Sequence, residues 1–179
     1  MDRDKLHSGN RFFAHRYESV RISDSIDSMN SFEEFENFYS DDLMGEDLLL
    51  GKYLGHLLKE HKISASKASD GIGKDESYVR KIVNSEVVNP SRDVLLALCV
   101  LIGASIEETQ ILLRYSGKQP LYARRKRDAI IWFALKKRQS IPDVEGKRYL
   151  QELNDYLESK EYASLCKIII KGERKNKKK

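Results

Sequence analysis

Proline and cysteine are scarce in this chain, and long apolar runs are missing from it. Its 179 residues include 3 prolines and 2 cysteines, while apolar residues make up 40% and charged residues 34% of the total. No apolar run approaches the roughly 20 residues that a membrane-spanning helix needs, and the opening MDRDKLHSGN lacks the apolar core of a signal peptide. We therefore expect a cytoplasmic all-α protein with no membrane partner.

Clustered metal ligands and catalytic groups are also missing. Cys99 and Cys166 each lie inside an apolar run and form no CxxC pair, so they indicate buried free thiols rather than a disulfide framework or a zinc site. His56 and His61 are five residues apart, about 140° around a helix, and cannot bind one metal ion together. Because no nucleophile or base recurs at a recognisable spacing, we expect no catalytic residues, no metal and no cofactor, and hence no enzyme.

The net charge of +4 hides an uneven distribution along the chain. Residues 1–47 contain 5 basic and 12 acidic residues, a net charge of −7, whereas the remaining 132 residues contain 27 basic and 16 acidic ones, a net charge of +11. This polarity indicates an acidic arm beside a basic body that is able to bind nucleic acid. The expected parts are an acidic arm at 1–46, partly disordered or forming short helices, a helical domain at 47–117, a helical extension at 118–170, and a tail at 171–179 with six basic residues in nine.

Apolar residues recur at spacings of three and four from Leu48 onward, which predicts five successive helices. The fourth, RDVLLALCVLI, is almost wholly apolar and is therefore expected at the centre of the fold. The expected elements are a helix from Leu48 capped by Asp47, a helix from Ser64 to a turn at Gly73, a helix at 75–84 capped by Asp75, a helix from Ser91 to Gly103, and a helix to about Gly117 opened by a capping box at Ser105–Glu108.

An internal match predicts a second pair of helices. The stretch RDVLLALCVLIGASI at 92–106 aligns with RDAIIWFALKKRQSI at 127–141 at a constant offset of 35 residues. The Arg-Asp and Ser-Ile pairs recur in place, and Ser140–Asp143 would renew the capping box. We therefore expect a second helix pair beside the first, with coincidence between two amphipathic pairs as the alternative.

The two short helices around Gly73 have the layout that pushes one helix into DNA. In the second of them, Val79 and Ile82 are three residues apart and face inward, which leaves a polar and charged outer face. The outward residues are Glu76, Ser77, Arg80, Lys81 and Asn84.

Several stretches of this region carry a resemblance to a known family. LGKYLGHLLKEHKIS leads to the turn at Gly73, SYV at 77–79 is followed by Ile82 and Asn84, and NPSRDVLLAL comes next. These stretches resemble the helix-turn-helix of the Cro and phage-repressor type, the XRE family. ALxxxxGxSIEETQxLLRYSG, PLY and RDAIIWFAL are similar to a subgroup with a second helical region, so the resemblance covers about residues 48–145.

The resemblance implies a five-helix repressor-like domain extended by a second helical layer. It also implies a sequence-specific double-stranded DNA-binding transcriptional regulator, with helix 75–84 in the major groove and a homodimer that reads two half-sites. The outward residues Glu76, Ser77, Arg80, Lys81 and Asn84 would read bases. The residues that would hold phosphates are Ser64, Ser66, Lys67 and Tyr78.

Three departures from the family pattern leave an alternative open. Ala65 stands where the family has Gln, Ala68 and Ser69 replace larger or apolar residues, and the acids Asp75 and Glu76 open the recognition helix. Asp75 suits a helix cap, and Glu76 is able to read cytosine N4. The alternative is a non-DNA-binding adaptor or antitoxin-like module that presents the same helix to a protein partner. Similarly, ARRKR at 123–127 is either a solvated helix start or a phosphate-contacting patch.

Overall fold

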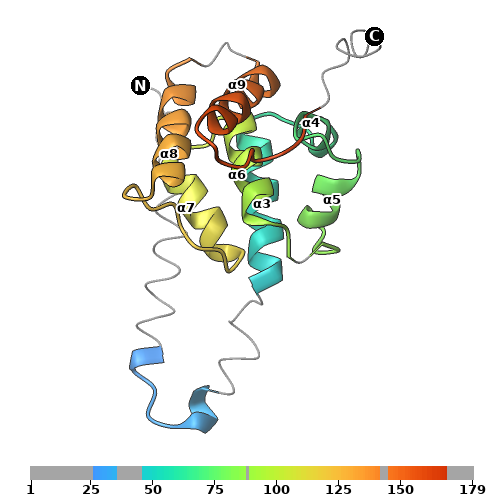
Figure 1. Ribbon diagram of the computed structural model, residues 1–179. Coiled ribbons are helices and arrows are strands. Elements are labelled where there is room, and N and C mark those ends of the chain that lie inside the picture. The colour runs from blue at the N-terminus through green and yellow to red at the C-terminus, as the bar shows by residue number, and fades with distance from the viewer. Residues whose placement is uncertain (1–25, 36–45, 88, 142–144, 169–179) are drawn as a thin grey trace, which may run out of the picture. The chain divides into compact units, whose positions relative to one another are not determined.

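The computed structural model describes residues 26–35, 46–87, 89–141 and 145–168, and every regular element within them is a helix, which confirms the all-α prediction. The chain divides into two compact units, residues 1–44 and 45–179 (Figure 1). In the first unit, residues 32–35 form one helical turn, where Ser31 Oγ accepts a hydrogen bond from the amide of Glu34 at 3.2 Å. Residues 1–25 and 36–45 of the predicted acidic arm, like the basic tail, lie outside the described residues.

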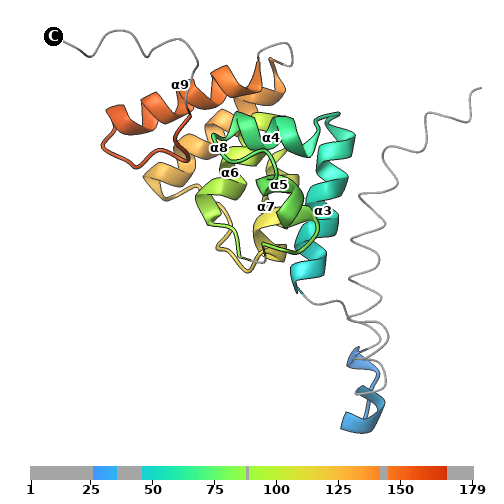
Figure 2. The same cartoon turned by 90° about the vertical axis from the view of Figure 1, so that its right-hand side faces the viewer.

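The second unit contains seven helices in its described residues. The central one is α6, in which every residue from Val94 to Ile102 is buried, as its apolar sequence predicts. The helices are α3 (Glu46–Glu60), α4 (Ala65–Gly71), α5 (Tyr78–Val83), α6 (Arg92–Ile102), α7 (Ile106–Tyr115), α8 (Lys126–Gln139) and α9 (Gly146–Ser159). Figure 1 places α5 and α8 on opposite sides of α6, and Figure 2 shows the same helices turned by 90°. No helix among these described segments is both long and apolar enough to cross a bilayer.

Most of the expected helix boundaries are confirmed. Ser64 and Ser91 cap α4 and α6 with their hydroxyl groups, and both bonds of the capping box at Ser105–Glu108 are present. Gly103 ends α6 with a φ of +79°, in the left-handed region that glycine adopts at low cost. These signals act within three or four residues, so the local sequence is enough to specify them.

Two predicted caps are wrong. α3 already begins at Glu46, so Asp47 lies inside the helix rather than before it. Ser140 does not open α9, because α8 continues to Gln139 through residues that favour helix, and the Ser140 hydroxyl donates to the carbonyl of Lys137 at 2.7 Å. α9 opens at Gly146 without a side-chain cap.

The two Arg-Asp pairs of the internal match bind each other across the helix pair. Arg92 donates to both carboxylate oxygens of Asp128 at 3.0 and 2.9 Å, and Arg127 donates to both oxygens of Asp93 at 2.8 and 3.0 Å. α8 therefore packs on α6 through two reciprocal bidentate contacts, and α9 also packs on α6. The expected position of a second helix pair beside the first is confirmed.

The segment after α9, residues 161–168, returns to the body of the unit, and we call it the C-terminal strap. Asn154 of α9 holds it by donating to the Cys166 carbonyl and accepting from the Leu165 amide, both at 2.9 Å. Its Lys167 carbonyl approaches the turn so closely that a Cβ added at Gly73 would lie 2.1 Å from that oxygen. The strap thus connects the carboxyl-terminal part of the chain to the turn between α4 and α5.

Candidate nucleic-acid interface

The turn between α4 and α5 depends on glycine. Gly73 has a φ of +69°, which other residues adopt only with strain. The Lys167 carbonyl of the strap also fills the place where a side chain would begin. Both conditions fix the direction in which the chain leaves α4, and they therefore fix the direction of α5.

Ser69 ties α4 to α5. Its side chain is fully buried, and its hydroxyl donates to the Ala65 carbonyl at 2.9 Å and accepts from the Val79 amide at 3.0 Å. Val79 lies in the first turn of α5, where amides lack a partner within the helix. The Ser69 hydroxyl on α4 therefore satisfies an amide at the start of the neighbouring helix α5.

Two glycines in α3 let α5 approach it closely. A Cβ at Gly51 would lie 2.5 Å from the Val83 carbonyl oxygen, closer than such contacts occur. A Cβ at Gly55 would lie 3.3 Å from a methyl group of Val83, a tight but adaptable contact. The end of α5 is thus set into the surface of α3, with Val79 and Ile82 buried beneath it.

The start of α5 differs from the prediction. The helix runs from Tyr78 to Val83, whereas we expected 75–84 with Asp75 as its cap. Asp75 Oδ1 instead accepts hydrogen bonds from the amide and hydroxyl of Ser77 at 3.0 and 2.6 Å, which closes a turn before the helix. The Ser77 hydroxyl, followed by its amide, holds the pKa of the Asp75 carboxyl below its ordinary value.

The predicted inward and outward positions on α5 are confirmed. Val79 and Ile82 are at most 1% exposed, whereas Arg80 and Lys81 are exposed on the opposite face. Asn84 is exposed as well, but it lies at the carboxyl-terminal cap of α5. Only two of the predicted base-reading residues therefore belong to the helix itself.

The other two predicted base readers lie in the turn that precedes α5. Ser77 is half-buried and bonded to Asp75, as described above. Glu76 is exposed, and its Oε1 accepts a hydrogen bond from the hydroxyl of Ser66 at 2.9 Å. The structure thus joins a predicted base reader to a predicted phosphate ligand. Both line a hollow of about 450 Å³ between α4 and the start of α5, together with Asp75 and Arg80.

The remaining predicted phosphate ligands, Ser64, Lys67 and Tyr78, differ in exposure. Ser64 is exposed at the start of α4, and Lys67 is exposed one turn later. Tyr78 is half-buried, burial raises the pKa of its hydroxyl, and the Lys74 ammonium group lies 5.4 Å from its ring centre. Lys74 is not among the residues predicted to bind phosphate, although its place directly after the turn glycine Gly73 is a usable signal.

The basic cluster at 123–127 is partly structural. Arg127 binds Asp93 and the Ala163 carbonyl, and Arg125 donates to Gln119 Oε1 at 2.9 Å. Because those guanidinium groups are bound within the chain, the cluster is less of a phosphate patch than its sequence indicates.

The cysteines and acids do not form a reactive centre where the structure describes them. Cys99 is fully buried, and burial raises the pKa of its thiol to about 12. Cys166 is only half-buried, unlike the buried thiol that we expected, and burial raises its pKa too. Within the described ranges, no three His, Cys, Asp or Glu side chains are arranged to hold a metal ion.

Comparison of the chain with models of known protein families, with curated proteins and with solved structures found no match.

Proposed function

We propose that this protein is a sequence-specific double-stranded DNA-binding regulator of transcription. In this proposal α3–α7 form a repressor-like helix-turn-helix domain, and α8 and α9 form a second helical layer on it. The observation that carries the proposal is the division of α5 into a buried face, with Val79 and Ile82, and an exposed face with Arg80 and Lys81. A short helix that presents cations from a rigid two-helix unit fits the DNA major groove.

The mechanism places α5 in the major groove, with the turn before it at the base edges. Arg80 is suited to donate to guanine O6 and N7, and Lys81 to a guanine or a nearby phosphate. A carboxylate has acceptor capacity for about four hydrogen bonds, so the contact with Ser66 leaves Glu76 able to accept from cytosine N4. Lys67 and Lys74 would bind the phosphates on either side.

The test is binding of the full chain to duplexes selected from a randomised library, measured by fluorescence anisotropy. Replacing Arg80 and Lys81 with Ala should weaken binding to the selected duplex, with each readout of a guanine costing about 1 to 3 kcal/mol. A matched control replaces Lys59 and Arg114, which are exposed cations on α3 and α7. Equal affinity of both double variants, with unchanged melting curves, would remove the recognition role of α5.

The acids beside the hollow favour a second candidate function. Asp75 and Glu76 place two carboxylates where a DNA reader normally carries neutral or basic groups. In an adaptor or antitoxin-like module, this hollow would receive a cationic side chain of a protein partner. The library selection distinguishes the two functions. A DNA-binding regulator should enrich particular duplexes, whereas an adaptor should enrich none above the starting pool.

A further inference from the structure

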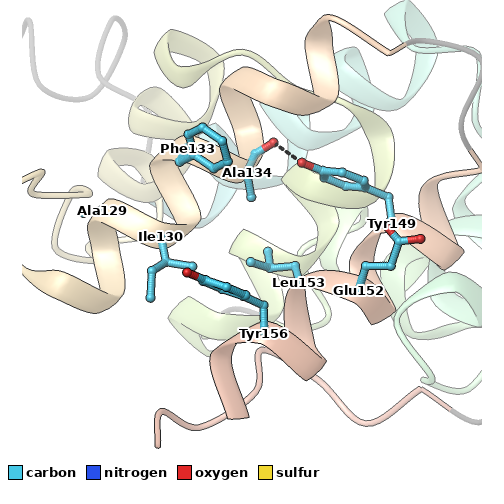
Figure 3. A pocket seen from close by; sticks show the side chains of 8 residues that line it. All are labelled: Ala129, Ile130, Phe133, Ala134, Tyr149, Glu152, Leu153 and Tyr156. Carbon is cyan, nitrogen blue, oxygen red and sulfur yellow. Dashed lines mark hydrogen bonds between the residues drawn. The ribbon is translucent and has the colours of Figure 1, made fainter. Parts of the chain in front are cut away.

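An apolar groove lies between α8 and α9, on residues that the proposed DNA contact does not use. Ile130 and Phe133 form one wall and Tyr149 and Tyr156 the other, around a volume of about 480 Å³ (Figure 3). The Tyr149 hydroxyl of α9 donates to the Ala134 carbonyl of α8 at 2.9 Å, and this bond holds the two helices in their relative position. The groove is therefore already formed in the isolated chain.

The aromatic side chains of the groove are exposed to an unusual degree. Phe133 is 69% and Tyr156 is 52% exposed, and apart from Tyr122 no other large apolar side chain in the described part of the second unit is this exposed. Single exposed apolar residues are ordinary, but two aromatic residues beside one preformed groove indicate a surface that another molecule covers.

The two edges of the groove carry opposite charge at one end. On α8, Lys136 and Lys137 are exposed three and four residues after Phe133, so they extend its face of the helix. On the other edge, Glu145 at the N-cap of α9 and Glu152 within α9 are exposed, four residues before and three residues after Tyr149. Glu152 also meets Arg148 of its own helix at 3.4 Å, but both side chains are more than half exposed, and such pairs are weak.

The helices run antiparallel, since Tyr149 lies beside Ala134 and Tyr156 lies beside Ile130 (Figure 3). A twofold axis along the groove would therefore lay α8 of one copy over α9 of the other at the same height. This operation places the basic edge over the acidic edge twice, and it buries the aromatic residues of both copies. We propose that a second copy of this chain covers the groove and that the protein forms a twofold symmetric dimer through α8 and α9.

The size of the face sets the expected strength of the dimer. A 14-residue helix is about 21 Å long and about 10 Å wide, so two adjacent helices offer a face of about 21 by 20 Å. Two such faces amount to about 840 Å², below the roughly 1,200 to 2,000 Å² in total that stable specific interfaces bury, so the dimer belongs with weak, transient associations. The dimer should therefore dissociate readily on dilution. α5 lies on the opposite side of α6 and stays accessible, so this inference can fail without affecting the proposed DNA contact.

Sedimentation equilibrium of the full chain over a range of concentrations tests the dimer. Tyr156→Glu and Phe133→Glu should each give a monomer at concentrations where the wild type is dimeric. Tyr122→Glu is the matched control, because Tyr122 is 53% exposed but does not line the groove, and this variant should remain dimeric. A wild type that stays monomeric up to about 1 mM, or groove variants that dimerise like the wild type, would overturn the proposal.

A charge exchange tests the symmetry. Lys136→Glu with Lys137→Glu makes both edges of the groove acidic, and Glu145→Lys with Glu152→Lys makes both basic. Each double variant should be monomeric alone, and an equimolar mixture should form a heterodimer, because both of its contacts again join opposite charges. Melting curves of each variant confirm folding. Failure of the mixture to associate, with both variants folded, would refute the assignment of α8 over α9.

Discussion

The reciprocal Arg–Asp contacts between α6 and α8 allow a matched comparison, because the two carboxylates differ in burial. The Asp128 side chain is 5% exposed, and it accepts two bonds from Arg92 and one from the Tyr122 amide. The Asp93 side chain is 36% exposed and accepts two bonds from Arg127. Replacing Asp128 with Ala leaves the Tyr122 amide without its acceptor and leaves the Arg92 guanidinium, which is 22% exposed, with only the Gln119 and Pro120 carbonyls; this should cost about 3 to 5 kcal/mol. Replacing Asp93 should cost about 1 kcal/mol or less, because its carboxylate is already partly exposed to water in the folded protein and contributes less to stability there.

Urea unfolding followed by circular dichroism measures both costs. With a slope of about 1 to 3 kcal/mol per molar urea, a difference of about 2 to 4 kcal/mol should separate the two midpoints by about 1 M or more. Replacing Arg92 with Met and Asp128 with Leu together should recover most of the loss, because both charges are then removed. If the Asp128 and Asp93 variants lose the same unfolding free energy, burial of the carboxylate does not determine how much these contacts stabilise the fold.

Three further outcomes are expected. Gly51→Ala should destabilise the protein by about 1 to 3 kcal/mol and weaken DNA binding, because its methyl group would collide with the Val83 carbonyl. Gly55→Ala meets only a side chain and should be nearly neutral; melting curves and anisotropy titrations measure both variants. For Glu108, burial acts to raise the pKa, but hydrogen bonds from His61 and the Ser105 amide outweigh it and hold the pKa below the ordinary 4.5. Its ionised form therefore stabilises the fold above about pH 4.5, and this stability is lost as pH falls through the lower folded-state pKa. Glu108→Gln removes the titrating group but keeps a side chain that can complete the capping box. This variant should therefore show a smaller loss of unfolding free energy on acidification than the wild type. Glu76→Gln should raise affinity for random DNA and relax one base position by about 1 to 3 kcal/mol in library selection; an unchanged enriched site would exclude base reading.

The sequence predicted those parts of the fold that depend on neighbouring residues. The caps at Ser64 and Ser91 and the stop at Gly103 each involve groups within four residues, and helical spacing alone identified Val79 and Ile82 as buried. The same local reasoning failed at Asp75, because its carboxylate has two possible uses, a helix cap or a turn with Ser77. The choice between the cap and the turn depends on how the surrounding helices pack, and the local sequence does not specify that packing.

Contacts between distant residues could not be predicted in this way. Ser69 binds Val79 ten residues away, and Arg92 binds Asp128 across 36 residues. The internal match did indicate that two similar helices pack together, but a repeat of Arg-Asp does not say that each arginine binds the aspartate of the other copy. The position of the C-terminal strap could not be predicted from its own residues, because the side chain of Asn154 on the preceding helix holds it in place.

If the proposed DNA contact forms, its salt dependence should follow from the charges around α5. Four exposed cations, Lys67, Lys74, Arg80 and Lys81, lie on α4, the turn and α5, beside two carboxylates. Each phosphate neutralised contributes about −0.9 to the slope of log affinity against log salt, so this surface alone gives a slope no steeper than about −3.6. The strap ends beside the same turn, and the sequence after it contains six more basic residues at 171–179.

If those tail residues bind flanking phosphates, the full chain should have a clearly steeper slope than a chain that ends at residue 168. The enriched sequence should be the same for both, because phosphate contacts carry no direct sequence information. Anisotropy titrations at several salt concentrations measure both slopes on one selected duplex. The shorter chain keeps the strap and its bonds to Asn154, so its melting curve serves as the folding control. Identical slopes would show that the tail does not reach the DNA, and a slope well beyond −3.6 for the shorter chain would show that binding uses cations away from α4 and α5.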